Sequence, residues 1–492
     1  MKKYFLLSCF IGVVMFGSSI DDKSLQLERP NILFCISDDQ SWLHTGAMGD
    51  PVVKTPAFDR ISHEGILFTN GFCDAPSCAP SRAAILTGQH IWRLEEAGNI
   101  HSRLPEKFPR YTDLLENAGY VIGSYRKAWS PGMFKTDTGW VFDGQSQLNP
   151  AGKRFESFKE FFQAKPENKP FCFWLGSYDP HRPYQLNSGL ESGMDPSKVI
   201  IPDHLPDDPV VRNDILDYYY EVQRWDSVVW EALSILHQAG ELENTLVVIT
   251  SDNGMPFPRS KATLYDYGTH MPLAISWPRG IVNPGRKYEG FVHLSDLAAT
   301  FLEAAGLEVL GEMTSKSLMD VFKQPEKAPR NNAYTAMERH DGCRKGGKGY
   351  PCRAIRTKDF LYIRNYEPDR WPAGDPDAIN CARTIPFGEV DPGPTKALLM
   401  DKKGDYQEFY ELAFGKRPAE ELYDLRADPG QINNVAALTE YSEILNELST
   451  QLQKYTTKTS DPRALGEDAP WDYYPYYGAC RNKDWAVDKK PD

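Results

Sequence analysis

Short apolar segments that alternate with a helical pattern are the feature of this sequence that most limits its fold. Each segment lacks charged residues, as expected for a strand of a parallel sheet that is covered on both faces. The segments are Asn31–Ile36, Tyr120–Tyr125, Phe171–Ser177 and Thr245–Thr250. Between the last two, apolar residues recur every three or four positions from Val222 to Leu236, as on one face of a helix. The alternation predicts an α/β domain built on a parallel sheet.

The pattern changes near residue 330. Phe360–Arg364 alternates like a strand, Leu422–Leu425 reads as another, and Tyr441–Tyr455 has an amphipathic helical pattern. These signals predict a smaller α+β domain over residues 331–460, after a first domain over residues 23–330. The remaining residues, 461–492, are rich in Pro, Asp and aromatic side chains, and we expect them to pack as irregular chain.

The N-terminus has the pattern of a secretory signal peptide. Basic residues at positions 2 and 3 precede an apolar run, Tyr4–Phe16, and small residues follow up to Ser19. The run is too short to span a membrane as a helix, so we expect a periplasmic or secreted protein without stable membrane insertion. An N-terminal anchor, or a lipid attached at Cys9, is the alternative interpretation.

Charge bears on the class of partner. The 492 residues include 55 Lys and Arg against 68 Asp and Glu, for a formal charge of −13. An acidic balance disfavours generic nucleic-acid binding. It still permits an anionic substrate, because a local basic pocket can lie on an acidic surface.

Nine cysteines are too few for a disulfide scaffold at this length, although export permits bridges. The pairs Cys343–Cys352 and Cys381–Cys480 are a plausible framework. Sequence alone leaves the other pairings of these four residues open, and free thiols as well.

Two predicted strands run into clustered polar side chains. The first leads to Asp38 and Asp39, and the last leads to Asp252 and Asn253. In open α/β sheets, ligands gather beyond the carboxyl ends of the strands. Converging carboxylates repel one another unless a cation lies between them, and an all-oxygen ligand set favours Ca²⁺ or Mg²⁺. Each motif alone is also a good turn or helix cap, which is the alternative interpretation.

Cys78 comes just before a helical pattern in which Pro80 suits the first turn and Gly88 the end. A helix N-terminus favours an anion, because its free N–H groups and its dipole point there. Arg82, one turn on, can hold two oxygens of the same anion. The segment predicts an oxyanion site beside a reactive side chain, with a buried cysteine at a plain helix start as the alternative.

The segment Cys78–Arg82, followed by Leu86-Thr87-Gly88, resembles the signature of the type I sulfatases. Other segments similar to that family follow the same order along the chain: Arg29–Leu33 leading to Asp38-Asp39, Thr55–Asp59, Ser251–Gly254, and Leu422–Leu425 with Asp428-Pro429. The resemblance covers residues from about 29 to 455. It implies an alkaline-phosphatase-like fold, with a mainly parallel sheet flanked by helices and a smaller C-terminal domain with an antiparallel sheet and a terminal helix.

The resemblance also implies a set of site residues. In that family the signature cysteine is oxidised to formylglycine by a maturation enzyme, which makes Cys78 the expected nucleophile. The family metal is Ca²⁺, with Asp38, Asp39, Asp252, Asn253 and the modified Cys78 as its ligands. Arg82 and Lys127 are implied to bind the sulfate.

Two further segments are most similar to the N-sulfoglucosamine sulfohydrolase (sulfamidase) group of the same family. They are Ser251–Pro258, with Leu264-Tyr265 after it, and Tyr178–Arg182. This likeness implies that Lys261 is a further sulfate-binding residue and that His181 protonates the leaving group.

One position departs from the family pattern. Two residues after the family lysine, here Lys127, the family has a histidine, and this chain has Trp129. A tryptophan cannot transfer that proton. We expect Trp129 to form an apolar wall or to stack on a sugar ring, and His270 is a candidate to compensate, with a plain loop residue equally open. Arg339 and His340 of the second domain are candidate substrate-binding residues, against the alternative of a solvated loop.

Together these features predict an exported hydrolase that removes sulfate from the O-sulfate or N-sulfate group of a sulfated carbohydrate. Two alternatives stay open. One is a phosphate-ester or phosphonate hydrolase of the same fold, although no second set of metal-ligand spacings is evident. The other is an inactive glycan-binding relative, which would follow if Cys78 were not oxidised or if Trp129 disabled the site.

Overall fold

The structure is a computed structural model that describes residue 1, residues 29–326 and residues 329–490. Apart from Met1, the predicted signal peptide, residues 1–19, lies outside the described residues. Among the described residues, no helix is long and apolar enough to cross a membrane.

An eight-stranded sheet forms the centre of the molecule, in the order β11-β2-β10-β9-β1-β8-β4-β7. β1 is parallel to both β8 and β9, and β10 is antiparallel to its two neighbours. The strands are β1 (Asn31–Ser37), β2 (Ile66–Phe72), β4 (Val121–Tyr125), β7 (Lys153–Phe155), β8 (Phe171–Gly176), β9 (Thr245–Ser251), β10 (His270–Ser276) and β11 (Arg286–His293). The four strands predicted from apolar segments are β1, β4, β8 and β9, which lie side by side.

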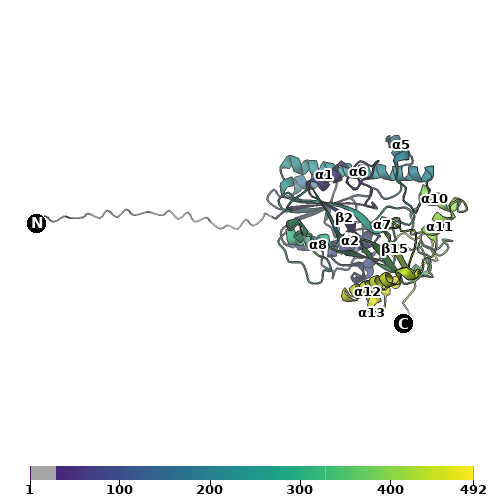
Figure 1. Cartoon of the computed structure of the whole chain (residues 1–492). Coiled ribbons are helices and arrows are strands. Elements are labelled where there is room, and N and C mark those ends of the chain that lie inside the picture. The colour runs from purple at the N-terminus through teal and green to yellow at the C-terminus, as the bar shows by residue number, and fades with distance from the viewer. Residues whose placement is uncertain (2–28, 327–328, 491–492) are drawn as a thin grey trace.

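Helices cover both faces of this sheet, as Figure 1 shows with α1 and α6 on one side and α8 on the other. One face packs against α1 (Pro56–Glu64), α4 (Phe158–Ala164) and α6 (Pro209–Ala239), and the other against α2 (Cys78–Thr87), α3 (Tyr111–Asn117), α8 (Asp296–Ala304) and α9 (Met319–Lys323). Side chains of β1 alternate between the two layers: Phe34 and Ile36 face α2 and α8, whereas Leu33 and Cys35 face α1 and α6. Burial on both faces explains why the central strands are continuously apolar.

A small three-stranded sheet extends one end of this domain. It consists of β3 (Ser102–Arg103), β5 (Gly132–Thr136) and β6 (Gly139–Phe142). Two short helices, α5 (Ser188–Glu191) and α7 (Asp266–Thr269), lie within connecting segments.

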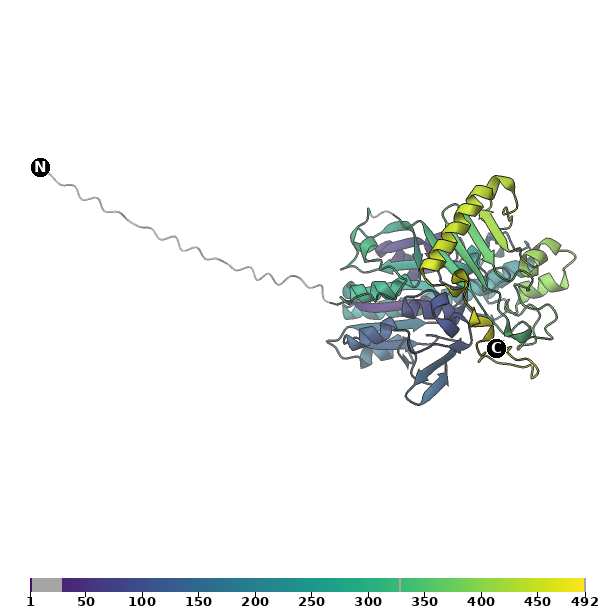
Figure 2. The same cartoon turned by 90° about the horizontal axis from the view of Figure 1, so that it is seen from below.

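The second half of the chain forms an antiparallel sheet of four strands in sequence order. These are β12 (Asn332–Met337), β13 (Cys352–Thr357), β14 (Phe360–Asn365) and β15 (Glu420–Asp424). The long helix α12 (Ser442–Lys458) lies across the strands of this sheet, as Figure 2 shows in yellow-green over green. Helices α10 (Pro394–Asp401) and α11 (Gln407–Phe414) pack as a separate apolar cluster. The predicted fold class, a mainly parallel sheet with helices on both faces plus an antiparallel α+β part, is confirmed.

The last described residues are mostly irregular, apart from α13 (Pro462–Leu465) and a 3-10 turn at Pro470–Tyr473. Trp471 anchors this tail: its ring is buried, and its indole N–H donates to the carbonyl of Glu95, 3.0 Å away. The tail therefore packs on the first domain as well as on the second.

None of the eight described cysteines forms a disulfide. The expected pair Cys343–Cys352 is wrong for this structure, because Cys352 lies on β13 in one apolar cluster while Cys343 lies in another with Cys381. Cys381 and Cys480 are likewise unbridged.

A buried ion-pair network ties the second sheet to the tail. Arg353 on β13 has a fully buried guanidinium, which donates to Asp461 at 2.7 and 3.1 Å and to Glu338 at 2.7 Å. Each partner comes from a different segment of the chain, so the network fixes where α12 ends relative to the sheet.

Removing one partner of a buried ion pair leaves an uncompensated charge, which typically costs about 3–5 kcal/mol. We therefore expect Asp461→Ala to lower the free energy of unfolding by about that amount, measured by urea denaturation. The matched control is Asp468→Ala, which removes a surface ion pair with Lys490 and should change stability little. Equal effects of the two substitutions would contradict this role for the network.

Candidate active site

The register of two parallel strands brings four polar side chains to one edge of the sheet. Ser37 of β1 pairs with Ser251 of β9, so the residues that follow these strands leave the sheet at the same level. Asp38 and Asp39 follow β1, and Asp252 and Asn253 follow β9, all of them at most 1 % exposed. Asp39 has a positive φ of 71°, a conformation that Asp tolerates better than most residues.

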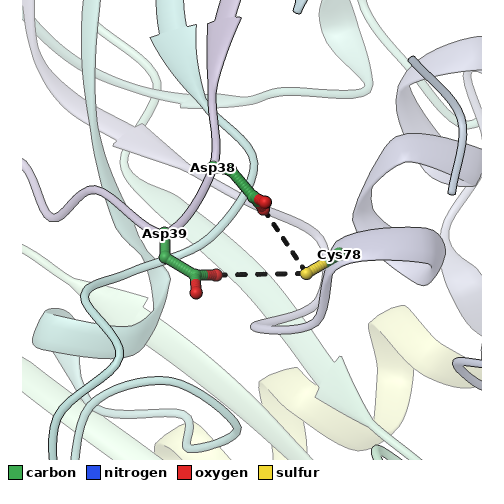
Figure 3. Close-up of side chains that lie close together, drawn as sticks. All are labelled: Asp38, Asp39 and Cys78. Atoms are coloured by element: carbon green, nitrogen blue, oxygen red, sulfur yellow. Dashed lines mark hydrogen bonds between the residues drawn. The ribbon is translucent and has the colours of Figure 1, made fainter. Parts of the chain in front are cut away.

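The N-terminus of α2 points at these carboxylates. Cys78 is the first residue of the helix, and its Sγ lies 3.6 Å from Oδ1 of Asp38 and 3.9 Å from Oδ1 of Asp39 (Figure 3). Ser81, in the same turn, donates through Oγ to the carbonyl of Asp252 at 2.6 Å. Every residue of α2 is buried, so the helix is fixed within the core.

Three basic side chains compensate the buried acids. Nζ of Lys127 lies 2.6 Å from both carboxylate oxygens of Asp38, and Nζ of Lys261 lies 2.8 Å from Asp39. Nε of Arg82 donates to Asp252 at 2.7 Å. The three bases come from separate parts of the chain, and each is paired with a different carboxylate.

The electrostatic balance keeps these groups charged. Burial opposes ionisation of Asp38, but Lys127, aided by His181 and Arg82, lowers the pKa of that carboxyl below its usual value. Burial likewise opposes the charge of Lys127 and Lys261, but the facing carboxylates raise the pKa of both amines. For Cys78, burial raises the pKa of the thiol well above its usual range, so the unmodified side chain is a neutral thiol.

Arg82 is bound more tightly than the sequence suggested. Its guanidinium is completely buried, and beyond Asp252 it donates to the backbone carbonyls of Lys127 and Ala128 at 2.9 and 2.8 Å. These contacts show Arg82 orienting Asp252 and the segment that carries Lys127.

His181 reaches the site from the segment after β8. Its Nδ1 lies 2.6 Å from the carbonyl of Arg182, which can only accept, so Nδ1 carries the hydrogen. Its Nε2 then faces the cluster, 3.7 Å from Asp39. The neighbouring Arg182 pairs with buried Asp214 through two hydrogen bonds of 2.8 Å, which holds this segment in place.

A residue that the sequence reasoning missed completes the site. Asp391, from the second half of the chain, accepts a hydrogen bond from Nζ of Lys261 at 3.0 Å. Ligand atoms of Asp39, His181 and Asp391 all lie within 4.8 Å of one another. Only an Asp-Pro-Gly turn marks this position in the sequence, and such turns are too common to indicate a site.

His340 is close to the nucleophile position. Its Nδ1 lies 2.8 Å from Oγ of Ser77, the residue before Cys78. Burial, followed by the charge of Lys261, lowers the pKa of His340 to about 3, so the ring is neutral.

Three other predicted substrate-binding residues are placed elsewhere. Trp129 is 1 % exposed and packs against Phe134, so it has no free face for stacking on a sugar ring. His270 is stacked between Trp42 and Phe72 and hydrogen-bonded to the carbonyl of Thr69, so it is not available to compensate for the missing histidine. Arg339 donates to carbonyls of the C-terminal tail, at Tyr474 and Pro475, and therefore holds the tail.

The strand-end residues fit a hard divalent cation. Asp38, Asp39 and Asp252 offer carboxylate oxygens, and Oδ1 of Asn253 is buried without a hydrogen-bond partner in the described part of the chain. Together with Asp391, four carboxylates face three bases, so an added divalent cation would make the cluster positive. A positive cluster at a helix N-terminus suits an anionic substrate.

Comparison with known families agrees with this geometry. Residues 30–307 match the family model described as "Sulfatase", which covers more than half of the chain. The protein therefore belongs to the sulfatase family, and the expected class of enzyme, a sulfatase or sulfamidase, is confirmed. Within the family, residues 259–377 match the model described as "N-sulphoglucosamine sulphohydrolase, C-terminal".

Individual relatives span nearly the whole chain. Human N-sulphoglucosamine sulphohydrolase is 28 % identical, with 89 % of this chain and 92 % of that protein covered. An ulvan-active sulfatase of Formosa agariphila is 25 % identical, with 90 % and 76 % covered. A solved enzyme in complex with its substrate D-glucosamine-2-N,6-O-disulfate has the same fold, at a TM-score of 0.62 and 20 % identity over 90 % of this chain and all of that one.

The burial of the thiols makes a simple chemical prediction. When the folded protein is treated with iodoacetamide at pH 8, we expect peptide mass mapping to find Cys480 alkylated, because it is the exposed member of the eight described cysteines. The buried thiols should stay unlabelled until urea is added. Rapid labelling of Cys352 or Cys381 in the folded protein would contradict the packing described above.

Proposed function

We propose that this protein is an exported sulfatase that removes sulfate from a sulfated saccharide at a formylglycine made from Cys78. The observation that carries the proposal is the position of Cys78: at the N-terminus of α2, within 4 Å of Asp38 and Asp39 and surrounded by three buried bases. A neutral thiol among hard carboxylate oxygens is a poor metal ligand and a poor nucleophile. Replacing its sulfur by oxygen would match the rest of the ligand set.

The reaction also needs two groups, and the chain would have to acquire both. A formylglycine at position 78, made by a maturation enzyme, supplies a hydrated aldehyde whose hydroxyl is a nucleophile. Asp38, Asp39, Asp252, Asn253 and the modified residue 78 would hold a Ca²⁺, which would supply Lewis-acid polarisation.

The chain's own side chains bind and orient the substrate. Lys127 and Lys261 carry positive charge close to Cys78 and stabilise the charge that develops on the sulfate oxygens. Arg82 acts through Asp252, which it holds in place. Nε2 of His181 is directed at the cluster. Because Nδ1 holds one hydrogen, the doubly protonated ring is the form that gives a proton from Nε2 to the departing oxygen or nitrogen.

Among sulfate positions, an N-sulfate of an amino sugar is the best supported. The support is the match of residues 259–377 to the sulphoglucosamine-specific model, because this region contains Lys261 and much of the second sheet. The substrate bound to the solved enzyme carries a 6-O-sulfate as well as an N-sulfate, so an O-sulfate is the competing substrate.

The nucleophile can be tested by mass and by activity together. We expect the mature protein to be lighter by about 18 Da at the peptide with Cys78, because one sulfur and two hydrogens are replaced by one oxygen. Wild-type enzyme should release free sulfate from glucosamine N-sulfate faster than from glucosamine 6-O-sulfate, and Cys78→Ala should release none. Because Cys480 is remote and exposed, Cys480→Ala is the matched control and should keep full activity. Sulfate release by Cys78→Ala at the wild-type rate would refute the proposal.

The metal can be tested without measuring activity. Calorimetric titration of chelator-treated protein with Ca²⁺ should show one binding event, and Ca²⁺ at 100 times its Kd should add about 2.7 kcal/mol of stability. We expect Asp38→Asn to weaken Ca²⁺ binding at least about tenfold, because one anionic ligand is lost. Asp405→Asn, at an exposed acid of the second half, should leave the affinity unchanged. Unchanged affinity in Asp38→Asn would contradict the assigned ligand set.

A further inference from the structure

Asp391 places a carboxylate in the candidate sulfate site, where a negative charge is unexpected. It lies against Lys261 and next to His181, close to Asp39. A negative charge there opposes binding of an anion, so the residue needs another explanation. It comes from the connection between β14 and β15 of the antiparallel sheet, whereas the groups it faces follow strands of the central sheet.

The segment that carries Asp391 is firmly held. The ammonium of Lys396 is largely buried and donates to three carbonyls of this segment, those of Pro386, Phe387 and Val390, at 2.8 to 2.9 Å. Three such hydrogen bonds to one cation fix the backbone immediately before Asp391.

The segment is also fastened to the one that carries His181. Thr395 donates to Asp214 through both its backbone N–H and its hydroxyl, at 3.1 and 2.6 Å, and Asp214 is the partner of Arg182. Gly393 packs so closely on Arg182 that an added Cβ would lie 2.5 Å from the guanidinium carbon. His181 and Asp391 are therefore set in place relative to each other by a shared, buried ion pair.

One oxygen of Asp391 is available to a ligand. Oδ2 accepts from Lys261, while Oδ1 has no protein partner in the described part of the chain. The side chain is 15 % exposed, against 0 % for Asp39, so Asp391 lies on the open side of the cluster. A carboxylate can only accept, so whatever it meets there must donate.

Asp391 lies next to His181, the group that protonates the leaving atom. Its Oδ1 is therefore expected beside the scissile bond. An N-sulfate carries a hydrogen on its scissile nitrogen, whereas the scissile oxygen of an O-sulfate carries none. When the S–N bond breaks, water supplies oxygen to sulfur, the nitrogen gains protons, and an ammonium and sulfate result. An ammonium is again a donor and is opposite in charge to the carboxylate.

We propose that Asp391 is a specificity-determining residue that accepts a hydrogen bond from the scissile N–H and so selects N-sulfated amino sugars over O-sulfated sugars. This inference rests on the proposed function. It assigns the choice of leaving group to a connecting segment of the antiparallel sheet, and the binding of sulfate to segments that follow strands of the central sheet.

The test uses the mature enzyme with two probes, glucosamine N-sulfate as substrate and inorganic sulfate as competitive inhibitor. In Asp391→Asn we expect kcat/KM for glucosamine N-sulfate to fall about ten- to a hundredfold, the usual value of a hydrogen bond to a charged group. The inhibition constant of inorganic sulfate should stay the same or decrease, because a negative charge has left an anion site. A fall in kcat/KM without weaker inhibition by sulfate cannot come from a general loss of structure.

Loss of sulfate inhibition and substrate turnover together would overturn the inference, because it would show that Asp391 only anchors Lys261. Unchanged kcat/KM in Asp391→Asn would overturn it too. Asp369→Asn, at an exposed acid of the same half, is the matched control and should alter neither constant. If wild-type enzyme releases no sulfate from either glucosamine N-sulfate or glucosamine 6-O-sulfate, the proposed function itself fails, which is a separate result from any change in Asp391→Asn.

Discussion

The repulsion among three buried carboxylates is the constraint on which the rest of the site depends. Asp38, Asp39 and Asp252 are all almost completely buried, and burying charges so close together is costly unless they are paired. Each is paired with a different base, and the three bases belong to α2, to the segment after β4 and to the segment after β9. The need for compensation thus explains why chain segments so far apart in sequence meet at one strand edge.

The same requirement reaches into the second half of the chain. Lys261 lies between Asp39 and Asp391, so one ammonium serves two acids from two structural units. Buried Asp214 has a comparable role, since it binds both Arg182 and Thr395. The antiparallel sheet therefore contributes to the candidate site, because the connection between β14 and β15 supplies Asp391.

Much of the fold and of the candidate site could be predicted from the sequence. The parts that could not be predicted share one physical cause. The central strands β1, β4, β8 and β9 are buried on both faces, so their apolar runs are visible without any tertiary information. Strand β7, at the sheet edge, contains charged residues and gives no such signal. Asp38, Asp39, Asp252 and Asn253 were found because they follow directly on predicted strands.

Asp391 could not be found in this way, because its contact with Lys261 joins residues 130 positions apart through a loop. Trp129 and His270 show the converse difficulty. Trp129 was expected to contact a sugar and His270 to carry a proton. Their burial and stacking result from tertiary packing, which no local sequence pattern shows.

The depth at which Cys78 lies has a consequence for the order of events in the life of the chain. The side chain is 2 % exposed, and the whole of α2 is enclosed between the sheet and its neighbouring helices. No other protein can reach that sulfur once the two layers have closed around it. Any enzyme that modifies Cys78 must therefore act on an unfolded or partly folded chain, so such a modification has to be complete before folding ends.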